Sequence, residues 1–173
     1  MECRRLRITI ISANNLPKVH DSSSTKIYAK ASIAGKHETE RRTPVDNVGE
    51  NNPQWNYNVP FTLTEAVVQH GSIDLHFKLY FEQKFKDNCI GEVKLSLKKL
   101  FDEDHSGESR ISCSVLQRDD SLVQNGTLNL SYSFGEIYVV KKPSIFVRAL
   151  QFLLATFVGS PPNACVDVDV IKP

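Results

Sequence analysis

The sequence predicts an all-β fold, an antiparallel β-sandwich, from three observations. Short segments alternate apolar and polar side chains, the period-2 pattern of strands that bury one face. Turn-forming residues recur between these segments. No long helix is predicted inside the region that these segments occupy. We therefore expect about eight strands in one sandwich.

The composition is that of one soluble globular domain. With 173 residues, 24% of them charged and 40% hydrophobic, the chain can form one core plus a tail. Twenty-one Lys and Arg balance twenty Asp and Glu, a net charge of +1, so we expect no nucleic-acid partner. The four cysteines are widely spaced, which disfavours a zinc site or a disulfide framework. Charged residues interrupt the amino end where a signal peptide would be apolar, so we expect a cytoplasmic protein.

The first segments in the chain have clear strand patterns. Residues 6–16 and 27–33 alternate apolar and polar side chains, and each predicts a strand with one buried face. Residues 34–36 predict a short hairpin turn. Residues 37–43 are almost wholly polar or charged, which predicts an edge strand, where charges discourage pairing with another chain.

A long loop then leads to the only tryptophan. Turn-forming residues fill positions 44–53. From Trp55 onward every second residue is apolar, as expected for a half-buried strand: Trp55, Tyr57, Val59, Phe61 and Leu63. We therefore expect Trp55 to anchor the core.

The second half of the domain continues the same pattern. Single helical turns are predicted at 65–70 and 98–104. The strongest alternation of the chain lies at 73–79 and predicts a central strand. Further strands are expected at 90–97, 111–115 and 126–134.

Residues 1–135 are expected to form the domain, and residues 136–173 a tail. Within the tail an apolar helix is predicted at about 144–158, with Pro143 favouring its start and Gly159 its end. The helix would span about 21 Å, too short for a hydrocarbon core of about 30 Å. Three uses are open for it: packing on the domain, lying in a membrane interface, or binding a protein partner.

Three short motifs carry a resemblance to a known family. TPVD (43–46), a polar loop, NPQWN (52–56) and IGEV (90–93) together resemble the pattern of C2 domains. The match is most similar to the small plant C2-domain proteins of the soybean cold-regulated group, and it covers residues 4–135. The resemblance implies an eight-stranded C2-type sandwich, and a role in plant stress or defence signalling.

The resemblance also identifies candidate calcium ligands. In calcium-binding members, aspartates from loops at one end of the sandwich hold the ion. The candidate carboxylates here are Asp21, Glu82 and Asp87, of which Asp87 is one residue out of register. Lys26, Tyr80 and Asn88 stand where further aspartates would be. Because calcium takes six to eight oxygens, we expect at best a degenerate site and no required cofactor.

A second implication of the resemblance is contact with anionic phospholipid. Each cation near an anionic surface contributes roughly 1 kcal/mol. Phe85 lies between two lysines, a combination suited to interfacial insertion, whereas Phe81 is open to a second interpretation as a core residue. The candidate lipid-binding residues are Lys26, Lys30, Lys36, Arg41, Arg42, Lys84, Phe85 and Lys86.

Enzymatic function is not expected. The chain has no G-x-S-x-G elbow, P-loop or dinucleotide fingerprint, and we assign no catalytic residue. Two functions remain. The first is a calcium-independent adaptor, peripherally associated with anionic membranes. The second is a protein-interaction module that uses residues 144–158 and has no direct lipid contact.

Overall fold

The computed structural model describes residues 1–17, 26–103, 107–116 and 122–140. Asp21 and the predicted tail helix at about 144–158 lie outside these ranges. In chain order the elements are β1 (Glu2–Asn14), β2 (Ile27–Ile33), a 3₁₀ turn η1 (His37–Thr39), β3 (Arg41–Arg42), β4 (Gln54–Thr64), α1 (Glu65–His70), β5 (Asp74–Phe81), β6 (Asn88–Ser96), α2 (Leu97–Glu103), β7 (Glu108–Leu116) and β8 (Leu122–Val139).

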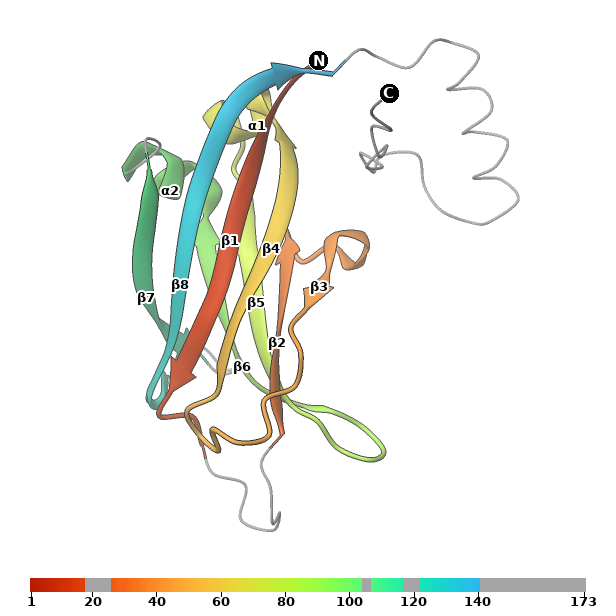
Figure 1. Cartoon of the computed structure of the whole chain (residues 1–173), viewed down its shortest axis with the longest axis vertical. Helices are drawn as coiled ribbons and strands as arrows, with labels where there is room; N and C mark the ends of the chain where they lie inside the picture. Colours follow the sequence, from red (N-terminus) through yellow and green to blue (C-terminus); the bar gives the residue numbers. More distant parts are fainter. Residues whose placement is uncertain (18–25, 104–106, 117–121, 141–173) are drawn as a thin grey trace, which may run out of the picture.

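The eight strands are antiparallel and form two facing layers. Their hydrogen-bonded order is β3-β2-β5-β6-β7-β8-β1-β4. Within the described residues β6 and β7 share only the pair Glu92 and Leu116, so the sheet divides there. Figure 1 shows β7, β8, β1 and β4 in front of β2, β5 and β6. The predicted antiparallel β-sandwich is confirmed.

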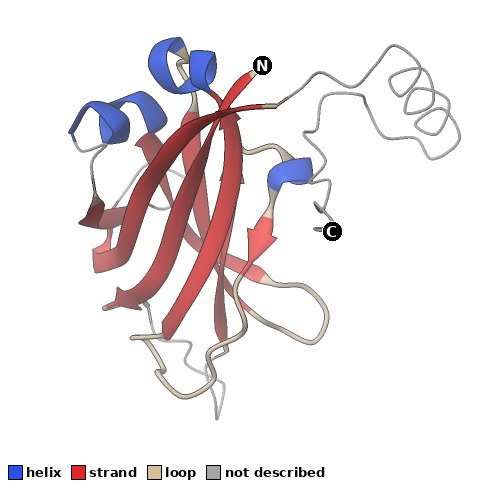
Figure 2. Cartoon of the chain, turned by 45° about the horizontal axis from the view of Figure 1, so that its top comes forward, coloured by secondary structure: helices blue, strands red, loops and turns tan. Residues whose placement is uncertain are grey.

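Helices close one end of the sandwich. Figure 2 shows α1 and α2 beside each other at that end. Both occur where single helical turns are predicted, and α2 buries Leu97, Leu100 and Phe101 against the core. None of the helices in the described ranges has the length and apolar character needed to span a bilayer.

The core lies between the two layers, as the alternating patterns predict. On β5 the inward residues Leu75, Phe77 and Leu79 are at most 1% exposed, and the strand lies inside the sheet between β2 and β6. Trp55 is partly buried against this core. Its indole N–H donates to the Ile27 carbonyl at 3.3 Å, so it links β4 of one layer to β2 of the other.

The predicted edge strand over residues 37–43 is wrong in its length. Ala34 and Gly35 both have positive φ, 51° and 66°, which turns the chain tightly at the end of β2. A 3₁₀ turn follows, and its Thr39 hydroxyl accepts the Ile33 N–H at 2.9 Å. The Thr39 side chain thus takes the hydrogen bond that a longer strand would have accepted from β2. β3 is therefore only two residues long, although it does lie at the sheet edge.

The last strand is longer than the predicted span of 126–134. Because β1 already begins at Glu2, the end of β8 has a partner, and pairing continues to Glu2 opposite Val139. The Met1 amino group donates to the Val140 carbonyl at 2.9 Å and closes this end. β8 therefore runs past the domain boundary expected at 135, which stays a prediction.

Candidate functional site

Cationic side chains gather on the outer face of the layer formed by β3, β2, β5 and β6. Cross-strand register places Arg42 opposite Lys30, and Lys30 opposite Lys78. One row further along β5, His76 lies opposite Lys94 of β6. Residues at directly opposed positions share one face of a sheet. We call Lys30, Arg42, Lys78 and Lys94 the cationic face.

Two stacked tyrosines support the cationic face. The rings of Tyr28 on β2 and Tyr80 on β5 lie 5.3 Å apart, with only 11° between their planes. The Arg42 guanidinium lies 3.7 Å from the Tyr28 ring centroid, and the Lys30 ammonium 5.3 Å from that of Tyr80. A cation over an aromatic ring is attracted by the negative ring face. The stack therefore fixes the positions of both cations.

Most cations of this face have an acidic partner. Glu40 pairs with Lys30 at 2.7 Å, and Glu82 pairs with Arg42 at 2.8 Å. A third pair, at 2.8 Å, joins the neighbours Glu92 and Lys94 on β6. Lys78 has no acidic group within ion-pair distance in the described part of the chain. Three of the four cations are thus paired, and the charge of Asp87 also acts on Arg42 and Lys30, so the face is close to neutral.

The loop between β5 and β6 is tied to this face by side chains. The Tyr28 hydroxyl donates to Asp87 Oδ2 at 2.6 Å, and the Gln83 N–H donates to Asp87 Oδ1 at 3.0 Å. The hydrogen bond from Tyr28 lowers the pKa of Asp87, and the Gln83 N–H lowers it further. Burial, followed by that same hydrogen bond, raises the pKa of Tyr28 above its usual range. At neutral pH a neutral phenol therefore donates to a charged carboxylate.

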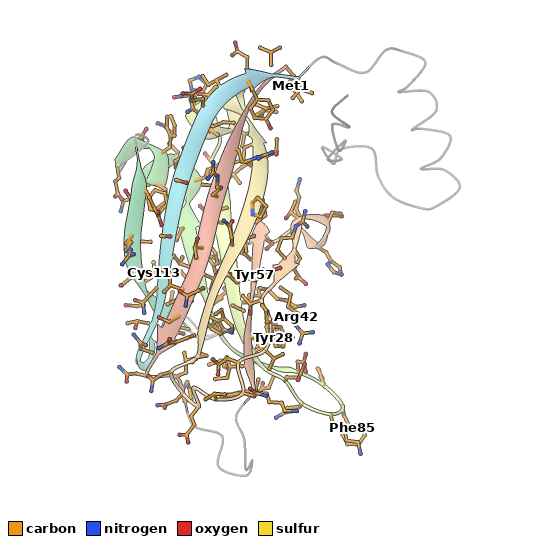
Figure 3. All side chains as sticks on the ribbon, viewed as in Figure 1. Met1, Tyr28, Arg42, Tyr57, Phe85 and Cys113 are labelled. Atoms are coloured by element: carbon orange, nitrogen blue, oxygen red, sulfur yellow. The ribbon has the colours of Figure 1, made fainter. Side chains whose placement is uncertain are left out.

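The tip of this loop is the most exposed apolar point of the described residues. Phe85 is 94% exposed. Figure 3 shows its side chain projecting away from the sandwich, at the end opposite Met1. The Lys84 ammonium lies 5.6 Å from the Phe85 ring centroid, and Lys86 is also exposed. In contrast, Phe81 is 6% exposed, which confirms the core interpretation of that residue.

The family of the chain is decided by its match to a family model. The model of the C2 domain matches residues 4–113. The chain belongs to the C2 domain family. Its sandwich, with loops gathered at one end and helices at the other, is thus the C2 fold, as the motifs around Trp55 predict.

Similar proteins come from plants. The chain is 34% identical to Protein SRC2 of Glycine max over 140 residues, covering 79% of this chain and 48% of that protein. It is 30% identical to the Protein SRC2 homolog of Arabidopsis thaliana over 139 residues, covering 80% and 43%. The chain thus spans about half the length of these curated relatives. Among solved structures, a C2 domain of plant Extended Synaptotagmin 1 is similar, with a TM-score of 0.63, 14% identity, and 79% and 96% coverage.

The described carboxylates of the C2 domain do not form a cluster that would suit calcium. Glu82 is engaged by Arg42, and Asp87 by Tyr28 and a backbone N–H. Among the described residues no group of three or more His, Cys, Asp or Glu could hold a metal ion. Asp21, the remaining candidate ligand, lies outside the described residues. The two described candidates thus organise the loop through hydrogen bonds within the protein.

The structure divides the candidate lipid-binding residues into separate groups. Lys30 and Arg42 meet on the cationic face, and Lys84, Phe85 and Lys86 form the loop tip. Lys26 is exposed at the start of β2, where its carbonyl accepts the Glu82 N–H at 2.8 Å. Arg41 lies opposite Ala31, a core-side position, and so on the other side of β3 from Arg42. Lys36 lies in the turn at the far end of β2.

Several members of this site are not among the residues predicted from the sequence. Lys78, Lys94, Tyr28 and Tyr80 all occupy positions that alternate with core residues. That alternation already assigns them to the outer face of their strands. The missing information was the register, since only the pairing of β2 with β5 brings Lys30 beside Lys78 and Tyr28 beside Tyr80.

Proposed function

We propose that this C2 domain is a non-catalytic adaptor that docks on anionic phospholipid membranes without requiring calcium. The observation that carries the proposal is Phe85, 94% exposed at a loop tip between two lysines. Burying an exposed phenylalanine is favourable by about 1.5–3 kcal/mol. In the free protein the exposed ring of Phe85 contributes little to the stability of the fold. A membrane interface would bury the ring in an apolar environment and place the two lysines beside anionic head groups.

The geometry of the loop supports this proposal. Glu82 N–H bonds to the Lys26 carbonyl at one end of the loop, and Asp87 accepts from Tyr28 at the other. Both anchors hold the segment that carries Phe85 before any membrane is present. A preorganised loop loses less conformational entropy on binding than a loose one.

Independence from calcium is supported by the same contacts. In a calcium-dependent site the ion would be the group that gathers loop carboxylates. Here Arg42 and Tyr28 already provide positive charge and a donor to Glu82 and Asp87. By resemblance to the soybean cold-regulated group, the adaptor would act in plant stress or defence signalling.

The test replaces the loop tip and measures membrane association. Phe85→Ser should reduce binding to phosphatidylserine-containing vesicles about tenfold or more, because the transfer of one aromatic side chain is lost. The control is Val139→Ser, which removes another exposed apolar side chain, 70% exposed, that lies opposite Glu2 beside the amino terminus. Co-sedimentation of the full chain measures both variants.

Three outcomes would be informative. A selective loss in Phe85→Ser supports docking through the loop. Equal binding of both variants and the wild type would remove the loop from the contact surface. If the wild type fails to sediment with anionic vesicles, the proposal fails, and the alternative of a protein partner bound through residues 144–158 takes its place.

A further inference from the structure

Two of the acids that compensate the cationic face come from outside its strands. Glu40 lies between η1 and β3, and Glu82 is the first residue after β5. Each reaches a cation whose position the tyrosine stack already fixes, Glu40 to Lys30 and Glu82 to Arg42. The two carboxylates thus occupy the donor groups that an anionic head group would use.

We propose that Glu40 and Glu82 are built-in competitors of the head group, which select for lipids of high charge density. The proposal rests on the proposed function, because it assigns the acids that control the same surface. A head group must displace both carboxylates to reach Lys30 and Arg42. Singly charged head groups gain little by this exchange, whereas a head group with several phosphates offers more charge and more acceptor oxygens than the carboxylates it replaces.

The two ion pairs are weak enough to be exchanged. The Lys30 and Glu40 side chains are 26% and 27% exposed, and those of Arg42 and Glu82 are 44% and 36% exposed. Ion pairs with this access to water contribute little net stability, because water and salt screen them. The fold therefore does not depend on keeping them closed.

The arginine keeps its place when its partner leaves. Arg42 lies over Tyr28 at 3.7 Å, and the Tyr28 hydroxyl is held by Asp87 rather than by Glu82. Loss of the Glu82 contact therefore leaves the guanidinium stacked, with its edge N–H groups available. A planar guanidinium presents these donors as a fork that matches two phosphate oxygens.

Lys78 can attract an anionic head group before the two ion pairs of the cationic face have opened. It lies beside Lys30 across the strands and has no acidic partner within ion-pair distance in the described ranges. Glu92 stands opposite it on β6, but that carboxylate is paired with Lys94. The face thus keeps one cation for long-range attraction, while two others become available only by exchange.

The experiment compares charge-neutral variants on two vesicle types. Glu40→Gln and Glu82→Gln should each increase binding to phosphatidylserine vesicles about fivefold, because each makes one cation available to the surface. Binding to vesicles with phosphatidylinositol 4,5-bisphosphate, at matched surface charge, should increase less. The ratio of binding to the bisphosphate vesicles over binding to the phosphatidylserine vesicles should therefore fall. Circular dichroism checks that each variant is folded.

Two controls separate this effect from a change in net charge. Glu103→Gln also removes a carboxylate from an exposed lysine, Lys99, but on α2 at the helical end of the sandwich. Glu103→Gln should change vesicle binding less than twofold, whereas Glu40→Gln and Glu82→Gln should each increase it about fivefold. In an Arg42→Gln background, Glu82→Gln should produce no gain, because the cation it releases is absent.

The outcomes distinguish this inference from the proposed function. If the wild type binds anionic vesicles but Glu40→Gln and Glu82→Gln behave as Glu103→Gln does, the competitor role is overturned and membrane docking stands. If the wild type and all variants fail to bind, both are overturned. If the wild type binds only the bisphosphate vesicles, and binding to phosphatidylserine appears only in the two face variants, the competitor role is supported directly.

Discussion

Asp46 illustrates how one side chain can organise a loop that has no regular structure. Its Oδ1 accepts the N–H groups of Val48 and Gly49 at 2.9 and 2.7 Å, and its Oδ2 accepts that of Gln54 at 3.0 Å. The sequence predicts a turn here from its composition. It cannot predict the bond to Gln54, because the intervening residues must first fold back.

We expect Asp46 to contribute pH-dependent stability. Burial would raise its pKa, but the three backbone N–H groups together lower it below the ordinary value. The folded pKa is thus below the unfolded value of about 3.9, so the contribution is complete above that pH and is lost as the pH falls through the folded pKa.

Asp46→Asn should therefore lower the free energy of unfolding by about 1–2 kcal/mol at pH 7, because charged acceptors bind N–H groups more strongly. At pH 3 the difference from wild type should be smaller. Urea unfolding at both values measures this. Asp102→Asn, in an exposed pair with Lys98, should change stability by less than about 0.5 kcal/mol. An equal loss at both pH values would contradict the role of charge.

At the scale of elements, periodicity predicted the buried strands and missed where pairing stops. β5 was predictable because it lies between β2 and β6 and buries every second side chain, which gives its sequence a strict alternation. Residues 37–43 were not, because their polar composition is compatible with an edge strand and with a 3₁₀ turn alike. The Thr39 hydroxyl decides between them by accepting the N–H of Ile33, which a neighbouring strand would otherwise take.

A largely buried ion pair joins β1 to α1. Arg4 bonds to both Glu65 oxygens at 2.8 and 3.0 Å, and also to the Gly135 carbonyl at 2.8 Å. The two side chains are only 12% and 13% exposed. The hydrogen bond to Arg4 lowers the pKa of Glu65, and Gln69 adds a second donor.

Arg4→Met should destabilise the domain by about 2–3 kcal/mol, because it leaves the Glu65 charge largely buried and unpaired. Adding Glu65→Met should recover part of the loss, since no unpaired charge then remains. Thermal unfolding of the four combinations measures the coupling. Arg5→Met, at an exposed neighbouring position, is the control. Additive effects of the two substitutions would contradict the pairing.

At the scale of the whole molecule, several cations of the candidate site could be predicted from the sequence, but the net charge of the site could not. Lys30, Arg42 and the loop lysines could be identified as cations of one region. The acidic partner of Arg42 could not, because Glu82 meets Arg42 across 40 residues of sequence, through the register of three strands. A local count of charges therefore overestimates how positive this surface is.

Membrane binding should not change when calcium is added or removed. Within the described residues the loop carboxylates are held by Arg42 and Tyr28, so millimolar calcium and chelator should give equal sedimentation with anionic vesicles. Added salt should weaken binding, because it screens the lysine contacts. A requirement for calcium would contradict this expectation.

The amino terminus lies at the opposite end of the sandwich from Phe85 (Figure 3). Met1 is held there by its bond to Val140, and β1, 13 residues at about 3.3 Å each, separates the two ends by about 40 Å. A reporter dye on the amino terminus would thus stand well above a bilayer that Phe85 enters, outside efficient contact with lipid-borne quenchers. The fixed separation between the amino terminus and Phe85 therefore allows the orientation of the domain on a membrane to be measured by quenching.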